Sequence, residues 1–305
     1  MDQAPFQPGA YLAPRYWPSW LALGMLRAAI LMPYTWQCRL GRMLGMALYH
    51  LHRKRRRIAA TNINLCFPDL PQAQREELVK ETFRHTGITV FETPLAWWGN
   101  PERLRKRCEI EGLHHLFEAL EHGKGVILLT GHSTSLEMGG RLLSLHTPVQ
   151  ALYRTVRNKL VNEVTLKARN GFLERIILRT KLRAALRGLK ENLATWYAPD
   201  QDFGTHGTVF AEFLGTPAAT LVAPAKLARL SGAKVVPFFP YRLPGDAGFK
   251  LVIEAALEDF PSGDDSRDAR RVNEILGRQV CKAPAQYMWV HRRFKTRPPG
   301  EPDVY

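Results

Sequence analysis

Apolar residues follow two different periods along the chain. Between residues 72 and 98 they recur at helical spacing, which predicts one or two helices there. From residue 126 onward, short apolar runs alternate with stretches of helical period. We expect strands at 126–130, 149–153, 194–197, 208–213, 235–240 and 250–254, and further helices at 35–52, 58–65, 137–145, 159–170, 182–191 and 220–231.

This alternation predicts an α/β fold with a mostly parallel central sheet flanked by helices. We expect a catalytic domain at 36–305, which comprises a helical lead-in at 36–100 and an α/β core at 101–305. Ligands of such sheets gather at the carboxyl ends of the strands, so residues that follow a predicted strand are the first candidates for a site.

The N-terminal segment 17–34 is apolar apart from Arg27 and has aromatic residues near both ends. It lacks a small-residue cleavage site, which argues against a signal peptide. Between Pro18 and Pro33 there are only about 14 residues, whereas a full span needs about 20. A basic cluster follows at 53–57. We expect residues 1–35 to form a single-pass or monotopic membrane anchor, with the catalytic domain on the cytoplasmic side; the alternative is a buried core helix.

The charge balance points to an anionic partner. Forty-three Lys and Arg against twenty-eight Asp and Glu give a net charge of +15, which fits nucleic acid, an anionic bilayer or a phosphorylated substrate. The segment 154–190 is strongly basic and is either a solvated face or a binding surface. Guanidinium groups bind phosphate bidentately, so Arg154, Arg157 and Arg169 are candidate substrate contacts. No nucleic-acid motif is present, and we expect no nucleic-acid partner.

The cysteines argue against a metal site. Cys38, Cys66, Cys108 and Cys281 are far apart and form no CxxC pair. This spacing fits neither a zinc site nor a disulfide framework, and it favours a reducing compartment.

The stretch VILLTGHSTSLEMGG places His132 at the exit of a buried strand and Glu137 five residues later. Residues five apart do not share a helix face, so the two can meet only if His132 lies in the turn before a helix. Glu137 would then reach back to the imidazole, fix its tautomer and leave the other ring nitrogen free as a base. The hydroxyls at 133–135 are expected to cap the helix, because no G-x-S-x-G elbow marks a serine nucleophile. A purely structural histidine is the alternative.

The sequence HSTSLE, with its strand, resembles the HX4(D/E) block of glycerolipid-type acyltransferases. Four further segments, PRYWPSW, NINLCFPDL, WYAPDQDFG and YMWVHRRFKTRP, together resemble the lipid A biosynthesis lauroyl (late) acyltransferases of Gram-negative bacteria. The resemblance extends from about Tyr11 to Tyr305. It implies transfer of a fatty acyl chain, for which a lauroyl chain is expected, from acyl carrier protein to a hydroxyacyl chain of a Kdo-lipid IVA precursor.

The resemblance also implies roles for particular residues. His132 corresponds to the general base, Glu137 to its partner, Arg169 to a basic residue that serves the substrate and Asp200 to a functional aspartate. The departure is at 133–135, where bulkier apolar residues are expected, and it bears on acyl-chain preference.

The implied partners are acyl carrier protein, the lipid A precursor and anionic lipid of the inner membrane. No metal or organic cofactor is expected, because a thioester is already activated. The basic and aromatic run 289–297 is expected to contact membrane or substrate. Two alternatives stay open: a glycerophospholipid or lysophospholipid acyltransferase, and a non-catalytic, membrane-tethered protein that binds anionic lipid.

Overall fold

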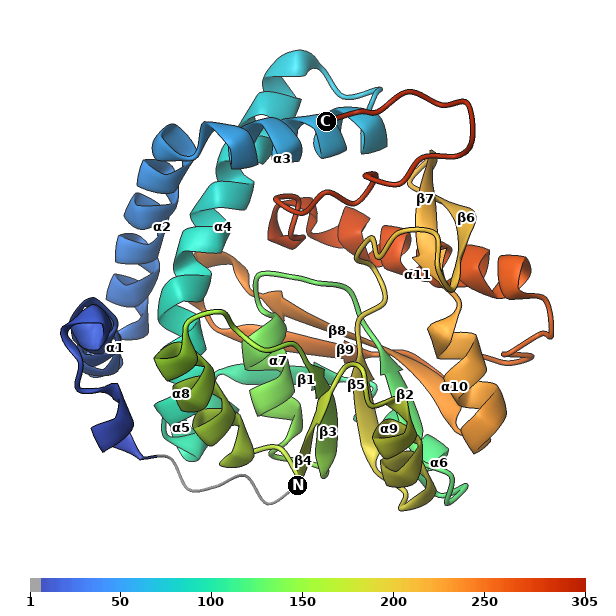
Figure 1. Ribbon diagram of the computed structural model, residues 1–305, viewed down its shortest axis with the longest axis horizontal. Coiled ribbons are helices and arrows are strands. Elements are labelled where there is room, and N and C mark those ends of the chain that lie inside the picture. Colours follow the sequence, from blue (N-terminus) through green and yellow to red (C-terminus); the bar gives the residue numbers. More distant parts are fainter. Residues whose placement is uncertain (1–6) are drawn as a thin grey trace.

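The computed structural model describes residues 7–305, and its centre is a seven-stranded sheet (Figure 1). The strand order is β1-β9-β8-β2-β5-β3-β4, in which only the β8–β9 pair is antiparallel. The strands are β1 Cys108–Glu111, β2 Val126–Leu129, β3 Val149–Tyr153, β4 Arg175–Leu178, β5 Ala194–Tyr197, β8 Lys234–Arg242 and β9 Phe249–Ile253. A separate antiparallel hairpin consists of β6 Thr208–Phe213 and β7 Thr216–Leu221. The predicted α/β class with a mostly parallel sheet is confirmed.

Helices cover both faces of this sheet, and a group of long helices flanks one side (Figure 1). The N-terminal helices are α1 Trp17–Ala29, α2 Tyr34–Leu51, α3 Arg53–Cys66 and α4 Gln72–Trp98. The others are α5 Pro101–Arg105, α6 Leu113–Leu120, α7 Leu136–Leu143, α8 Lys159–Asn170, α9 Leu182–Lys190, α10 Ala223–Ser231 and α11 Asp265–Lys282.

Strand β2 lies at the centre of the core. All four of its side chains are fully buried, as expected for a parallel strand that is covered on both faces. Val126 and Leu128 pack with residues of α6 and α7, whereas Ile127 and Leu129 pack with residues of α10 and α11 on the other face. The strand is therefore held rigidly where it delivers the chain to His132.

Helix α2 packs closely along α4 because glycines face the contact. A Cβ atom on Gly45 would lie 2.1 Å from the carbonyl oxygen of Phe83, and one on Gly87 would lie 2.1 Å from that of Gly41. The two backbones can approach this closely only without side chains at these positions. This packing fixes α4, which in turn contacts the loop that carries His132.

The predictions for several elements need correction. The short edge strands β1 and β4 were not predicted, nor were α5, α6 and α11. Thr220 belongs to β7, and the helix expected from 220 begins only at Ala223. The signal for α11 was present in the sequence: Val272, Ile275 and Leu276 have helical spacing and are buried.

The predicted anchor contains α1, and its residues 1–6 lie outside the described residues. Within residues 7–305, none of the helices combines the length and the apolarity that crossing a membrane requires. The alternative of a buried core helix is wrong, because Trp17, Leu21 and Met25 are exposed and Leu23 is the buried residue of this helix.

Candidate active site

The loop between β2 and α7 carries His132 and is held by its backbone from two sides. The Met288 N–H donates to the His132 carbonyl at 3.0 Å, and the Thr134 N–H donates to the Gln286 carbonyl at 2.8 Å. From α4, the Thr89 hydroxyl donates to the Thr134 carbonyl at 2.7 Å. The position of the loop is thus set by α4 and by the C-terminal segment.

Asp200, rather than Glu137, holds the imidazole of His132. The His132 Nδ1 lies 2.5 Å from Asp200 Oδ1, and the His132 backbone N–H donates to Asp200 Oδ2 at 2.8 Å. Strand register explains the meeting: β2 and β5 are parallel neighbours with Leu129 opposite Tyr197, and each of the two residues lies three positions further along its chain.

Burial and pairing set the charge states of this pair. The Asp200 side chain is 1% exposed and that of His132 is 23% exposed. Burial alone would lower the pKa of His132, but the charge and hydrogen bond of Asp200 outweigh burial and raise it. Burial likewise opposes ionisation of Asp200, yet the charge and two hydrogen bonds of His132 hold the pKa of this carboxyl below its usual range. Within residues 7–305 the His132 Nε2 has no hydrogen-bond partner, so it can accept a proton from a bound molecule.

Glu137 points to other partners, so the predicted contact between Glu137 and His132 is wrong. Glu137 Oε1 accepts from Trp97 Nε1 at 2.7 Å and from Arg169 Nε at 2.9 Å. Glu137 Oε2 accepts from Arg169 Nη2 at 2.5 Å. Both oxygens are occupied by groups from α4 and α8, and this bidentate pair links α7 to α8.

The predicted side-chain cap of α7 is also wrong. Ser135 is the N-cap residue, but its hydroxyl makes no capping hydrogen bond. The hydroxyls of Ser133, Thr134 and Ser135 are buried without a partner within the described part of the chain. Ser133 also lines an apolar pocket beside Gly131 and Tyr287. Ser133 is thus the one residue of the three that borders this pocket.

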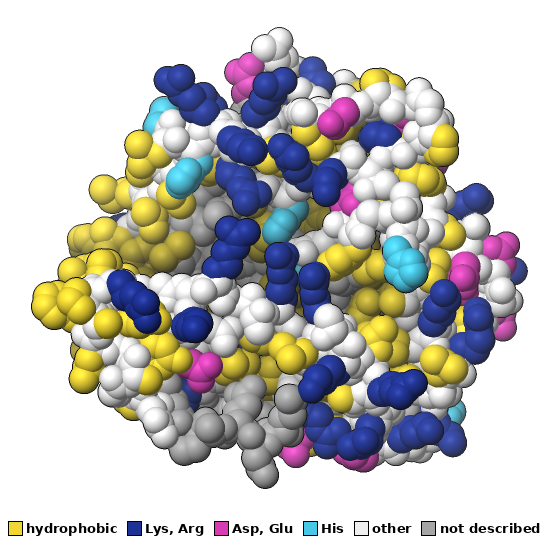
Figure 2. All heavy atoms as spheres, viewed as in Figure 1, with side chains coloured by type: hydrophobic (Ala, Val, Ile, Leu, Met, Phe, Trp, Pro, Cys, Tyr) yellow, Lys and Arg dark blue, Asp and Glu magenta, His cyan; other side chains and the backbone are white. Residues whose placement is uncertain are grey.

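Arginines predicted for substrate binding lie around the same edge of the sheet. Arg154 and Arg157 are exposed in the loop after β3, and the charge of Arg154 reaches His291. Arg169 is held by Glu137 and lies over the ring of Tyr153, 5.4 Å from its centroid. Figure 2 shows Lys and Arg side chains gathered around a hollow in which a histidine is visible. The site is thus rich in cations that are suited to an anionic ligand.

His291 belongs to the run 289–297, which was expected to contact membrane or substrate, and its position beside His132 was not predicted. Its ring centroid lies 6.1 Å from that of His132, and its Nε2 is 3.5 Å from the amide nitrogen of Gln201. Burial and the positive charges of His132, Arg55 and Arg154 lower the pKa of His291 to about 4. A neutral second imidazole therefore lies beside the base.

The run 289–297 is less exposed than expected. Arg293 and Phe294 are buried, and Arg293 Nη1 donates to the carbonyl of Ala219 at 2.8 Å. Arg292 and Lys295 remain exposed. Arg293 attaches the C-terminal segment to the hairpin. Because Trp289 is fully buried as well, the prediction of a membrane or substrate contact is wrong for Trp289, Arg293 and Phe294.

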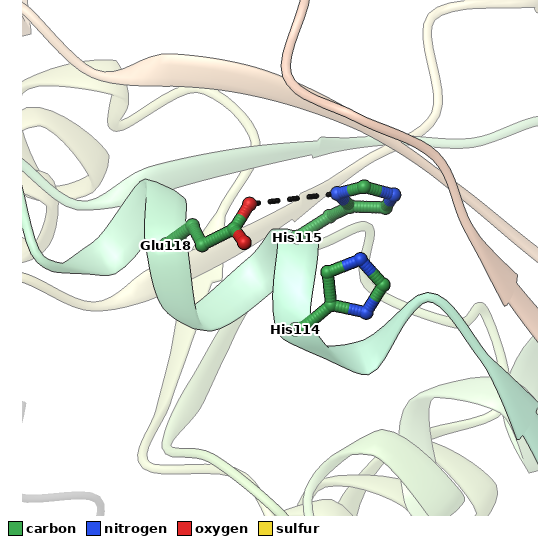
Figure 3. A group of neighbouring side chains, drawn as sticks. All are labelled: His114, His115 and Glu118. Atoms are coloured by element: carbon green, nitrogen blue, oxygen red, sulfur yellow. Dashed lines mark ion pairs between the residues drawn. The ribbon is translucent and has the colours of Figure 1, made fainter.

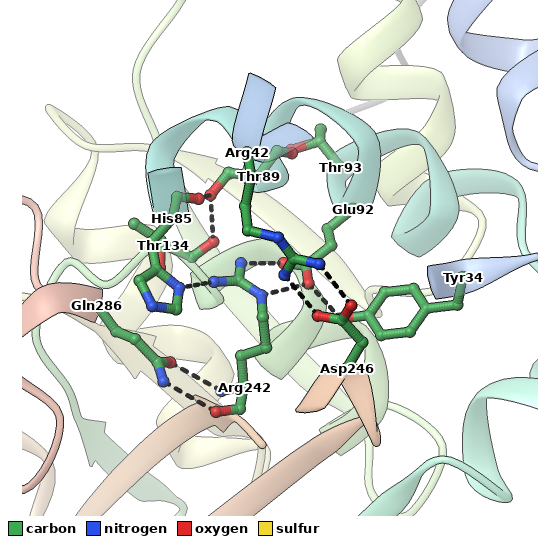
Figure 4. A network of polar contacts seen from close by, with 10 residues as sticks. All are labelled: Tyr34, Arg42, His85, Thr89, Glu92, Thr93, Thr134, Arg242, Asp246 and Gln286. Carbon is green, nitrogen blue, oxygen red and sulfur yellow. Dashed lines mark hydrogen bonds and ion pairs between the residues drawn. The ribbon is translucent and has the colours of Figure 1, made fainter. Parts of the chain in front are cut away.

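A buried ion pair lies behind the His132 loop (Figure 4). Arg242 Nε and Nη2 donate to the two oxygens of Glu92 at 2.7 and 2.6 Å, and both side chains are 2% exposed. The Tyr34 hydroxyl also donates to Glu92, at 2.6 Å. Gln286 hydrogen-bonds the backbone N–H and carbonyl of Arg242 at 2.8 Å each. Because the backbone carbonyl of Gln286 also accepts a hydrogen bond from the Thr134 N–H, this network connects β8 to the His132 loop.

A group of possible metal ligands lies on α6, away from these contacts (Figure 3). The potential ligand atoms of His114, His115 and Glu118 all lie within 4.8 Å of one another. His114 and Glu118 are exposed, and His115 Nδ1 is 3.5 Å from Glu118 Oε2. None of the three takes part in the hydrogen bonds that hold His132, and the expectation of a metal-independent reaction stays a prediction.

Comparison with known proteins places the chain in one family. Residues 4–296 match the family model described as bacterial lipid A biosynthesis acyltransferase. The chain is 38% identical over 296 residues to the lipid A biosynthesis palmitoleoyltransferase of Escherichia coli K12, covering 97% of this chain and 96% of that protein. The lauroyltransferase of the same strain is 34% identical over 297 residues, covering 97% of both chains. A lipid A biosynthesis acyltransferase of Haemophilus influenzae is 35% identical over 305 residues, covering 98% and 97%.

A solved structure of a 1-acyl-sn-glycerophosphate acyltransferase from Thermotoga maritima aligns with 84% of this chain and 99% of its own, with a TM-score of 0.38 and 17% identity. That likeness is too distant to add to the assignment. The family match and the curated relatives, which cover nearly the whole chain, are sufficient: the chain belongs to the bacterial lipid A biosynthesis acyltransferases and is an acyltransferase.

Proposed function

We propose that this enzyme transfers a fatty acyl chain from acyl carrier protein to a hydroxyacyl chain of a Kdo-bearing lipid A precursor, with His132 as general base. The observation that carries the proposal is the Asp200 carboxylate, which binds both the Nδ1 and the backbone N–H of His132 and leaves Nε2 open. The function of the curated relatives supports the acceptor class.

The proposed reaction is a single acyl transfer. His132 Nε2 takes the proton of the acceptor hydroxyl while the hydroxyl oxygen attacks the carbonyl carbon of the thioester. Asp200 stabilises the imidazolium that forms, because its charge is already held next to Nδ1. The C–S bond then breaks, the new ester bond remains, and the imidazolium returns the proton to the departing thiolate. No metal or organic cofactor enters this scheme.

Glu137 acts in this scheme through Arg169. The Glu137 carboxylate holds the Arg169 guanidinium in one orientation beside the proposed substrate site. Arg154, Arg157 and Arg169 would then contact phosphate or sugar-acid groups of the acceptor, for which guanidinium geometry is well suited. Glu137 is thus proposed as a positioning residue and not as the partner of the base.

The apolar surface of α1 is the proposed contact with the inner membrane, on its cytoplasmic side. Trp17, Leu21 and Met25 repeat every four residues and are exposed, and Leu31 is exposed just after the helix. Figure 2 shows apolar side chains gathered over this side of the molecule. Such a stripe favours insertion in the plane of the lipid surface, and the basic residues of α3 would add attraction to anionic lipid.

Binding to vesicles tests the membrane proposal. Leu21→Ser with Met25→Ser should weaken binding to vesicles of phosphatidylethanolamine and phosphatidylglycerol, whereas Leu230→Ser, which changes an exposed leucine of α10, should not. Equal binding by all three proteins would rule out α1 as the contact.

Two measurements test the reaction. Mass spectrometry of lipid A from cells that lack the protein should show the loss of one acyl chain, and the lost mass identifies that chain. We propose lauroyl, while the relatives include palmitoleoyl and myristoyl transferases. The purified enzyme should restore the chain to a Kdo-bearing precursor from a loaded acyl carrier protein. Unchanged lipid A, or acylation of lysophospholipid in place of the precursor, would refute the proposed acceptor.

A further inference from the structure

Helix α9 and the turn before it form a strongly basic surface outside the His132 site. Its cations, which we call the α9 surface, are Arg179, Lys181, Arg183, Arg187 and Lys190, and all of them are exposed. No Asp or Glu occurs between 179 and 190. Figure 2 shows Lys and Arg side chains gathered over the position of α9.

The α9 surface is presented by a rigid helix. Ala185, Gly188 and Leu189 on its inner face are buried. At Gly188 the helix lies directly against Gln150 of β3, because a Cβ there would be 1.9 Å from the Gln150 amide oxygen. Gln150 Nε2 in turn donates to the Ala185 carbonyl at 3.0 Å. The outward cations therefore have a fixed backbone, which a specific contact requires.

This surface continues into the loop that holds the catalytic histidine. The Arg179 guanidinium lies over the ring of Phe203, 5.2 Å from its centroid, and Phe203 is exposed. Phe203 is three residues beyond Asp200 in the loop after β5. A molecule bound to the α9 surface would thus adjoin the segment that leads to the His132–Asp200 pair.

The observations favour an acidic protein over a bilayer as the occupant. The more exposed apolar residues gather on α1, on the opposite side of the molecule, where Trp17, Leu21 and Met25 are 61–66% exposed (Figures 1 and 2). Leu182 and Phe203 at the α9 surface are only 41% and 42% exposed. The α9 surface has exposed Leu182 among its cations, a mixture that fits a protein contact with a polar rim. Complementary charge would speed the encounter with an acidic partner.

We propose that the α9 surface docks the acidic carrier protein that delivers the acyl thioester. This inference rests on the proposed function, because it takes the donor to be carried by a protein. The docked carrier would extend its thioester arm along the loop after β5 to reach His132 Nε2.

Charge reversal tests the docking surface. In the double variant Arg183→Glu with Arg187→Glu, the KM for the acyl carrier protein thioester should rise at least about tenfold at low salt, while kcat is unchanged. Added salt should reduce the difference in KM between this variant and the wild type. Transfer from acyl pantetheine, which lacks the carrier protein, should stay at the wild-type rate. Arg103→Glu, which reverses an exposed arginine of α5, is the matched control and should leave both substrates unaffected.

Direct binding separates this inference from the proposed function. The double variant should bind holo acyl carrier protein at least about tenfold more weakly than wild type does, which can be measured without turnover. Unchanged carrier binding would overturn the docking surface even if transfer is observed. Weaker binding to anionic vesicles with unchanged carrier binding would assign the surface to the bilayer and also overturn it. If the wild-type enzyme binds the carrier but transfers no acyl chain from any thioester, the proposed function is refuted instead.

Discussion

Two carboxylates flank the His132 loop, and each pairs with a basic group of a different kind. Asp200 directs one oxygen to the imidazole and the other to the backbone N–H of the same residue. Glu137 is fully occupied by a guanidinium and an indole N–H. An imidazole can gain and lose a proton near neutral pH, whereas a guanidinium stays charged. The first pair is therefore suited to proton transfer, and the second can only hold charge and position.

Proximity along the chain does not predict which of these two carboxylates contacts His132. Glu137 is five residues from His132, while Asp200 is sixty-eight residues away and makes the contact. Strand pairing accounts for the result, since β2 and β5 are neighbours in the sheet and deliver both residues to one edge. Substitutions in the His132–Asp200 pair and in the Glu137–Arg169 pair should therefore have different effects.

Removal of the base should have the largest effect. His132→Ala should lower kcat by about 10²–10⁴-fold, because the acceptor hydroxyl loses its proton acceptor. Steady-state transfer from acyl carrier protein would measure this, and circular dichroism with vesicle binding would show that the fold and the membrane contact persist. A variant that retains wild-type turnover would exclude proton transfer by His132.

Asp200→Asn should reduce kcat by about 10²-fold, since the tautomer and the stabilising charge are both lost. The pH profile is the sharper readout. Transfer needs neutral His132, so activity should fall as the pH drops through the raised pKa of this histidine. Without the Asp200 charge, burial lowers that pKa, and the acidic limb should move to lower pH. An unmoved limb would show that Asp200 does not govern the imidazole.

Glu137→Gln should leave the acidic limb of the pH profile of transfer at its wild-type position. We expect kcat/KM for the acceptor to fall about tenfold, in line with the loss of a charged hydrogen bond to Arg169. Glu77→Gln is the control, because Glu77 pairs with Arg84 on the exposed side of α4. If Glu137→Gln shifts the limb as Asp200→Asn does, the separation of the two pairs fails.

The sequence predicts most of the sheet and the position of His132, because buried strands have continuous apolar runs. It does not reveal which strands are neighbours, and the partner of His132 depends on that order. The direction of the Glu137 side chain is likewise set by Trp97 and Arg169, which come from distant helices. The edge strands β1 and β4 were missed because they are short and only partly buried.

The position of His291 beside His132 was not predicted, for a related reason. It lies in a segment whose charges and aromatic residues predict a surface, yet Arg293 and Phe294 are buried and bring the segment against the hairpin. Hydrogen bonds from Asn62 to the carbonyls of Trp289 and His291, at 2.6 Å each, hold it to α3. Such long-range backbone contacts leave no local pattern in the sequence.

Thr89→Val should have the smallest effect and tests how firmly the loop must be held. The change removes the hydrogen bond from α4 to the Thr134 carbonyl and keeps the side-chain shape. One such bond contributes about 1 kcal/mol, so kcat should fall about fivefold with the pH profile unchanged. Thr93→Val, which removes only a bond within α4, is the control. Equal activity of the two variants would mean that the contacts with Met288, Gln286 and Asp200 are sufficient to hold the loop.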